Sequence, residues 1–421
     1  MDGFSLLPDD TLSKILSFLE TKDVMQTMLL SKRFKSLWKL VPRLEFDDMR
    51  VTEHEYAKFW RFVDRAFMSH EGQALQNLHL KLRRQCTDGD VAIWVGTAVK
   101  RGLMELEFMN YNFSWTASMP KSLYTCGTLV VLKLLNVKLD VPDLVCLRSL
   151  KTLSLKYMNR SEGSSSLLRL LPNCPVLEDL FIHLTPYPNP AMPFKIVVPS
   201  LKRLSLFDSC QDSGITGLVL DAPCLKFLHV VDRWSHSRNS QSINMNEVVE
   251  DNMGVILNRP EKLLRSLASV EHILLCLSAP EVVYPVGSCF SRLKFLEVCP
   301  CKSEWLDLFM RLLKDSPSVK SIKINRCHCV LYPPRPYIRP HWNRPSSVPR
   351  CLSSNLEFFK WINYEGTQEE KELSTYILKT AVCLKKASFT AKSNDDKKKL
   401  ELLRELSLSR RASSTCELVF N

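Results

Sequence analysis

One hydrophobic pattern returns along most of this chain, with a large apolar residue at the first, fourth and sixth positions of a six-residue unit. The units begin at Leu75, Leu103, Leu129, Leu150, Leu177, Leu201, Leu225, Val270, Leu293, Val319 and Leu356, with a weaker one at Leu384. Successive side chains of a strand point to opposite faces, so the fourth and sixth positions of each unit would enter a core together. The pattern therefore predicts one short strand per unit.

The spacing of these units indicates a repeat architecture. The first seven begin 21 to 28 residues apart, which fits the period of roughly 20 to 29 residues of leucine-rich repeats. We therefore predict an α/β fold in which residues 75–345 form a leucine-rich-repeat solenoid with a curved parallel sheet.

The outward positions of the predicted strands carry aromatic side chains and both signs of charge. The basic residues are Lys81, Lys133, Lys156, Arg203, Lys323, Lys360 and Lys386, the acidic ones are Glu105, Glu107, Asp179 and Glu297, and the aromatic ones are Phe181, Phe207, Phe227, Phe295 and Phe358. A phosphate-binding strip would be more uniformly basic, so this mixture favours a protein partner. Phe181, Arg203, Phe207 and Phe227 are our candidate substrate-binding residues here. The alternative, that some of these aromatic side chains pack beneath loops, stays open.

Two intervals between units, Leu225 to Val270 and Val319 to Leu356, are too long for one repeat and predict loops. The second is rich in Pro and Arg, and it contains the candidate substrate-binding residues Arg335, Tyr337, Arg339 and Trp342. These side chains would suit an acidic or phosphorylated segment. The alternative is an ordinary surface loop.

The first fifty residues predict three short helices. Leu12, Ile15, Leu16 and Leu19 have the spacing of one helix face, behind the helix-starting residues 8–10. Asp23 is expected to cap a second helix with Val24, Met28 and Leu29, and a third apolar set, Phe34, Leu37, Trp38 and Val41, ends at Pro42. Helices this short cannot bury so much apolar surface alone, so a partner is expected.

These residues resemble the F-box motif in its plant form, through Leu7-Pro8-Asp9-Asp10, Ile15-Leu16, Leu19, Asp23-Val24 and Leu30 to Arg33 with Leu37-Trp38. The resemblance departs at Phe34, where Trp is common, and at Glu20, where Pro is common. It implies an F-box at residues 1–48 that binds a Skp-type adaptor and, through it, a cullin-RING assembly. By position it assigns Leu7, Pro8, Leu12, Ile15, Leu16, Leu19, Val24, Leu30, Leu37 and Trp38 to that interface or just beneath it. The alternative is that the helices only cap the array.

The last seventy residues resemble the FBD domain that accompanies F-boxes and leucine-rich repeats in a plant family, through Cys351-Leu352, Leu356-Glu357, Ile362 and the ending Cys416 to Phe420. Helical periodicity covers 370–386 and 397–408, and 416–420 predicts a closing strand. We expect an FBD-like cap at 346–421 that shields the end of the array, and a helical linker at 49–74.

Composition narrows the function. The net charge of +12 raises the possibility that the chain binds nucleic acid. Basic and acidic side chains are equal in number over residues 1–50, however, and the excess of positive charge is spread over the rest of the chain, so we do not favour that partner.

No apolar run is long enough for a membrane span, and the N-terminus lacks a basic signal-peptide region. The fifteen cysteines, mostly single within apolar segments, indicate reduced thiols. The pairs Cys299/Cys301 and Cys327/Cys329 lack zinc spacing. We expect an intracellular chain, in the nucleus, the cytoplasm or both.

An enzyme would need a convergent set of catalytic groups. The chain has no phosphate-binding Gly loop, no His-Glu-x-x-His and no nucleophile elbow. We therefore predict a non-catalytic substrate-receptor subunit of a ubiquitin ligase, with no cofactor and no metal, and with an unidentified protein as substrate. The alternative is a leucine-rich-repeat scaffold without a ubiquitin-ligase role.

Overall fold

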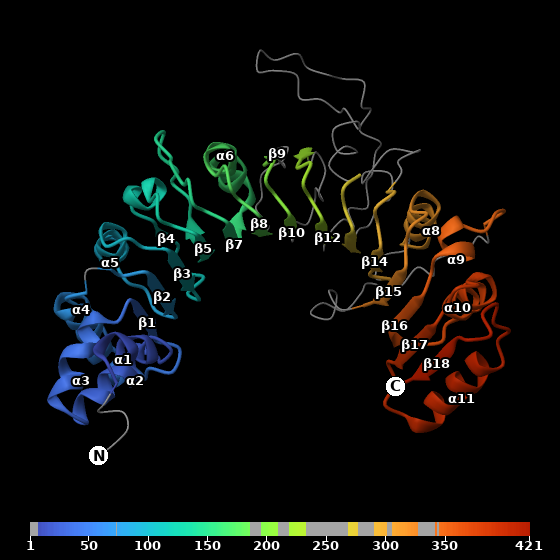
Figure 1. The fold of residues 1–421 in the computed structure, drawn as a ribbon, viewed down its shortest axis with the longest axis horizontal. Helices are drawn as coiled ribbons and strands as arrows, with labels where there is room; N and C mark the ends of the chain where they lie inside the picture. The colour runs from blue at the N-terminus through green and yellow to red at the C-terminus, as the bar shows by residue number, and fades with distance from the viewer. Residues whose placement is uncertain are drawn as a thin grey trace, which may run out of the picture. The chain divides into compact units, whose positions relative to one another are not determined.

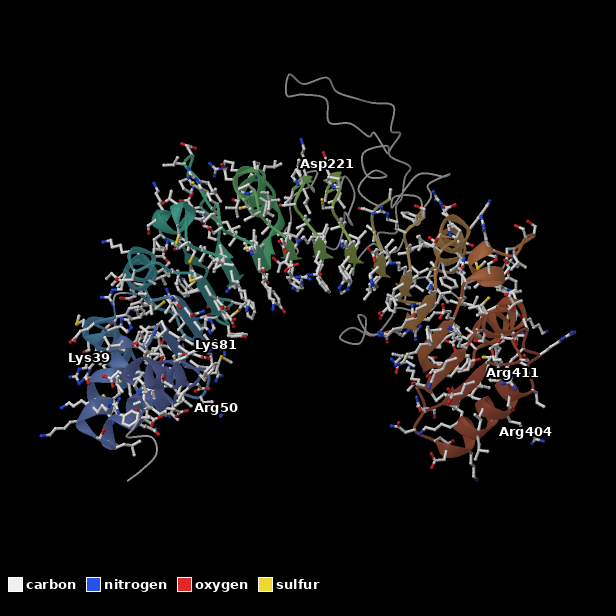
Figure 2. All side chains as sticks on the ribbon, in the orientation of Figure 1. Lys39, Arg50, Lys81, Asp221, Arg404 and Arg411 are labelled. Carbon is white, nitrogen blue, oxygen red and sulfur yellow. The ribbon has the colours of Figure 1, made fainter. Side chains whose placement is uncertain are left out.

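The computed structural model describes residues 7–72, 74–185, 195–208, 219–232, 268–276, 290–300, 305–326, 342 and 345–421. The chain divides into two compact units, Met1–Tyr187 and Pro188–Asn421. Each is built around parallel strands with helices on one face (Figure 1), and side chains lie on both faces of the strands (Figure 2). Among the described residues, none of the helices has the length and apolarity needed to cross a membrane.

The first unit begins with three short helices and continues as a parallel sheet. Helices α1 (Asp9–Leu16), α2 (Thr21–Gln26) and α3 (Lys32–Leu37) precede β1 (Arg43–Asp47) and α4 (Tyr56–Ser69). The remaining main elements are β2 (Asn77–Leu82), α5 (Asp88–Lys100), β3 (Glu105–Asn110), β5 (Val131–Leu135), β7 (Thr152–Asn159), α6 (Arg160–Leu170) and β8 (Asp179–Thr185). The strand order is β1-β2-β3-β5-β7-β8, so each strand lies beside its predecessor in the main sheet.

The repeat pattern accounts for the core of this unit. Leu78 of β2 aligns with Leu106 of β3, which aligns with Leu132 of β5, and all three are buried. Between the helices, the rings of Trp60 in α4 and Trp94 in α5 stack with their centroids 5.0 Å apart. The aligned leucines thus form rows across the strands, which is the packing expected of a solenoid.

The second unit continues the same pattern. Its main strands are β10 (Arg203–Asp208), β12 (Phe227–Asp232), β13 (His272–Cys276), β14 (Phe295–Val298), β15 (Ser321–Asn325), β16 (Phe358–Tyr364), β17 (Lys386–Ala391) and β18 (Glu417–Phe420), in that spatial order. Its helices include α8 (Trp305–Asp315), α9 (Arg350–Ser354), α10 (Gln368–Thr380) and α11 (Asp396–Ser407). In both units the predicted fourth and sixth positions are buried, from Leu78 and Leu80 to Ala387 and Phe389.

Three local predictions need correction. Strand β1 was not among the predicted strands, although its register places Leu44 and Phe46 beside Leu78 and Leu80. The helix predicted over 370–386 ends at Thr380, where Ala381 turns to an extended conformation, and Lys386 belongs to β17. Asp23 is not the cap of the second helix, since α2 starts at Thr21 and Glu20 occupies the capping position without a side-chain hydrogen bond.

Several cysteines serve as buried apolar side chains, as expected. Cys86, Cys174 and Cys351 are buried, and burial raises the pKa of each thiol to about 12. These thiols are therefore protonated and unreactive at neutral pH. Of the cysteine pairs considered for zinc, Cys301, Cys327 and Cys329 lie outside the described residues.

Candidate protein-binding surfaces

The three N-terminal helices have a small core of their own. Half of the residues assigned to the adaptor interface lie in it, namely Leu12, Leu16, Val24, Leu37 and Trp38, each at most 4% exposed. These side chains shape the surface from beneath, since they are too deeply buried to touch a partner.

Other side chains of the same segment are exposed. Ile15 is 38% exposed, Leu19 41% and Leu30 72%, while Leu7 is half-buried and Pro8 exposed. Phe18 and Leu29 were not among the residues assigned to the interface, yet they are 77% and 89% exposed. Phe18 follows α1, which ends at Leu16. A large apolar side chain outside the predicted helix face was the signal that the sequence offered. We call Ile15, Phe18, Leu19, Leu29 and Leu30 the exposed N-terminal set.

Polar contacts fix the helices to each other and to the sheet. Arg33 of α3 donates from Nε to Oδ1 of Asp9 over 2.8 Å and also donates to the carbonyl oxygen of Leu7. The hydroxyl of Thr21 accepts a hydrogen bond from the backbone N–H of Glu45 in β1 at 2.6 Å. The start of α1 is therefore held by α3, and α2 is held by the first strand.

Charges on the strand face of the first unit neutralise one another. The ammonium of Lys133 lies 3.4 Å from Glu105 and 3.2 Å from Glu107, and His79 lies 3.4 Å from Glu105. The hydrogen bond with His79, followed by the charges of His79 and Lys133, lowers the pKa of Glu105 to about 2. His79, Glu105 and Glu107 bring three potential metal-ligand atoms within 4.8 Å. Because Lys133 already contacts both carboxylates, the arrangement is better described as an ion-pair network.

An aromatic group lies further along the same unit. Lys156 is placed over the ring of half-buried Phe181, with Nζ 5.4 Å from the centroid. Tyr157, at an irregularity in β7, contacts Phe113 and His183 with centroid distances of 5.0 and 4.6 Å. The outward position of Phe181 is thus as predicted, but its ring is partly covered by its neighbours.

The remaining candidate residues belong to the second unit. Arg203 is exposed, and Phe227 is 40% exposed. Phe207 packs against buried Val231, Cys276 and Cys299. This ring therefore contributes to packing, and only part of it is available to a partner.

Of the candidate residues in the Pro- and Arg-rich loop, only Trp342 lies among the described residues. Trp342 is half-buried and lies edge-on to Tyr376 of α10 with the centroids 5.6 Å apart. Arg335, Tyr337 and Arg339 lie outside the described residues. Trp342 is therefore anchored against the C-terminal segment.

Comparisons with known proteins agree with this architecture. An F-box domain model matches residues 4–46, a model described as FBD-associated F-box protein At5g56370, LRR repeats, matches 91–249, and an FBD model matches 344–389. FBD-associated F-box protein At5g56380 of Arabidopsis thaliana is 60% identical, with all of both chains covered. The chain belongs to the FBD-associated F-box family.

Two further Arabidopsis thaliana relatives of this family are 42% identical. They are probable FBD-associated F-box protein At1g32375, covered in full, and F-box/FBD/LRR-repeat protein At5g56420, of which 99% is covered, each across all of this chain. Among solved structures, the crystal structure of a TLR13-ssRNA13 complex aligns with 84% of this chain and 53% of its own at 16% identity, with a TM-score of 0.32, a likeness too weak to support inference.

Membership in the FBD-associated F-box family confirms the predicted plant F-box, leucine-rich-repeat and FBD architecture. F-box and leucine-rich-repeat proteins generally serve as non-catalytic substrate-recognition adaptors of ubiquitin ligases.

Proposed function

We propose that this chain is the substrate-receptor subunit of a Skp-cullin-F-box ubiquitin ligase, active in the nucleus, the cytoplasm or both. Its N-terminal helices bind the Skp-type adaptor, and its repeat array binds a protein substrate. The chain itself supplies no catalytic group, since ubiquitin transfer belongs to the other subunits.

The exposed N-terminal set carries this proposal. Three short helices with their own buried core nevertheless leave Phe18, Leu29 and Leu30 more than two-thirds exposed. Single exposed apolar residues are ordinary, but an exposed apolar patch marks a protein-binding surface, and Phe18, Leu29 and Leu30 are the side chains that would form it here. The resemblance to the F-box motif indicates that the partner is a Skp-type adaptor.

Co-purification with a Skp-type adaptor tests the proposal. The full chain should retain the adaptor, and the double substitution Leu29→Ser/Leu30→Ser should abolish retention without unfolding the chain. Leu408→Ser is the matched control, because Leu408 is 79% exposed at the end of α11 in the other unit. If the wild-type chain fails to retain the adaptor, or the double variant retains it fully, the adaptor role is wrong and the scaffold alternative stands.

A further inference from the structure

Three aromatic side chains form a row across the strand face of the second unit. The parallel register places Phe227 of β12 beside His272 of β13, and His272 beside Phe295 of β14. The rings of Phe227 and His272 stack with centroids 4.5 Å apart and an interplanar angle of 20°, and those of His272 and Phe295 are 5.6 Å apart at 31°. These spacings are near the separation of about 4.8 Å between neighbouring strands. We call Phe227, His272 and Phe295 the aromatic row.

The aromatic row has an apolar character at neutral pH. Burial lowers the pKa of His272, an effect that the charge of Glu271 opposes and that of Lys294 reinforces. The imidazole is therefore neutral at pH 7 and packs as a ring between two phenyl groups. Because Phe227 remains 40% exposed, the row is accessible to apolar side chains of a partner.

A basic pocket adjoins this row at the ends where the strands begin. It has a volume of about 400 Å³ and is lined by Glu271, Ser291, Arg292, Lys294, Ser318 and Lys320. Glu271 directly precedes His272 of the row, and Lys294 directly precedes Phe295. The lining residues all precede β13, β14 or β15, so the pocket lies beside the aromatic row at the ends where these strands begin.

The pocket has an excess of positive charge. Lys294 forms an ion pair of 3.1 Å with Glu271, which leaves Arg292 and Lys320 against no other acid in the lining. Lys320 contacts Glu357 at 3.4 Å at the edge of the pocket, and exposed Lys226 lies one strand before Glu271. Because these Lys and Arg side chains belong to successive repeats, their charges are separated. They suit several carboxylates along a peptide better than a single phosphate group.

We propose that the aromatic row and the basic pocket bind an extended acidic peptide segment of the substrate. Its apolar side chains pack on Phe227 and Phe295, while its Asp or Glu carboxylates meet Arg292 and Lys320. This inference rests on the proposed function and specifies the chemistry of the substrate. Stacking rings beside basic groups also occur in nucleic-acid sites. Here the ladder of basic residues is interrupted by Glu271 and Glu357, which would repel a continuous phosphate backbone.

Selection from a library of random 12-residue peptides displayed on phage tests this inference on the purified full chain. Enriched peptides should combine Asp or Glu with aromatic or large aliphatic residues. One enriched peptide, synthesised with a fluorophore, should then bind the double variant Phe227→Ser/Arg292→Glu at least about tenfold more weakly by fluorescence anisotropy. The matched control is Phe113→Ser/Arg148→Glu, which changes an exposed ring and an exposed arginine of the first unit and should bind like wild type.

Each other outcome overturns the inference. Enriched peptides that are neutral or basic would exclude an acidic segment, and equal loss in both double variants would place binding elsewhere. A single-stranded oligonucleotide that binds wild type but not Phe227→Ser/Arg292→Glu, with no acidic peptide enriched, would assign the surface to nucleic acid. Since the adaptor is absent from this assay, failure here leaves adaptor retention intact, and loss of adaptor retention leaves peptide binding intact.

Discussion

The guanidinium of Arg101 donates a hydrogen bond to Nδ1 of buried His70 over 2.8 Å. An arginine can only donate, so Nδ1 of His70 must accept, and the proton of the neutral ring is on Nε2. That nitrogen lies 2.8 Å from the carbonyl oxygen of Val41. The neutral imidazole thus connects the end of the N-terminal helices to Arg101 at the end of α5.

This relationship predicts how stability depends on pH. Burial lowers the pKa of His70 below 6.5, and the charge of Arg101 lowers it further, against the effect of the bond to Val41. The unfolded chain then binds this proton more readily than the folded chain, so the contribution is complete above pH 6.5 and is lost as the pH falls through 6.5 toward the lowered value. Urea unfolding between pH 7.5 and 5 should show a steeper loss for wild type than for His70→Gln. Parallel profiles would contradict this assignment.

The N-terminal helices should respond differently to changes in buried and exposed leucines. Leu12 is 1% exposed, so Leu12→Ala should lower the free energy of unfolding of the first unit by about 2 to 5 kcal/mol. Leu29 is 89% exposed, and Leu29→Ser should change stability by no more than about 0.5 kcal/mol. Denaturant unfolding followed by tryptophan fluorescence compares them. Equal destabilisation would mean that Leu29 packs in the folded chain.

The sequence alone predicted most of the strands, because an apolar pattern repeated over many units is a strong signal even where a single unit would be ambiguous. It also contained the signal for β1, since Val41, Leu44 and Phe46 follow the same spacing and are all buried. Val41 was assigned to the end of the third helix, and Leu44 and Phe46 were assigned to no element, so the strand was missed. Periodicity identifies a helix face, but it did not separate buried Leu16 from exposed Ile15, because that depends on how the helices pack.

The division of the strand face into distinct surfaces was also beyond the sequence. Phe207, Phe227 and Phe295 all occupy outward positions, yet Phe207 packs on a buried cluster while Phe227 stacks on His272. His272 gave no signal of its own, because its role depends on its register between two phenylalanines. The basic pocket joins residues from successive repeats, which only the three-dimensional pairing brings together.

Gly366 should be intolerant of a side chain. Its φ of 72° favours glycine, its N–H donates to Oε2 of Glu370 over 2.7 Å, and an added Cβ would collide with Leu402 of α11. Gly366→Ala should cost about 1 to 3 kcal/mol of stability. Gly102→Ala separates backbone strain from steric collision. Gly102 also has a positive φ, of 79°, but no atom lies within 4 Å of the added Cβ. Thermal unfolding should therefore rank Gly366→Ala below Gly102→Ala, and the reverse order would contradict the predicted collision with α11.

Glu297 should depend on Lys323 for its place within the second unit. Glu297 is only 5% exposed, and its Oε2 lies 3.0 Å from the ammonium of Lys323, while Asn325 donates to Oε1 over 3.2 Å. Lys323→Met would leave the buried carboxylate of Glu297 with one neutral donor, which should lower stability by roughly 1 to 3 kcal/mol.

The double variant Lys323→Met/Glu297→Leu should recover much of that loss, because it removes the uncompensated charge. The matched control is Lys385→Met, which breaks an ion pair with Glu357 whose lysine side chain is 63% exposed and should change stability little. Denaturant midpoints are compared for wild type, Lys323→Met, Lys323→Met/Glu297→Leu and Lys385→Met. They test whether the buried carboxylate of Glu297 depends on Lys323. If Lys323→Met and Lys385→Met lose equally little stability, water reaches Glu297 and the carboxylate does not need its partner.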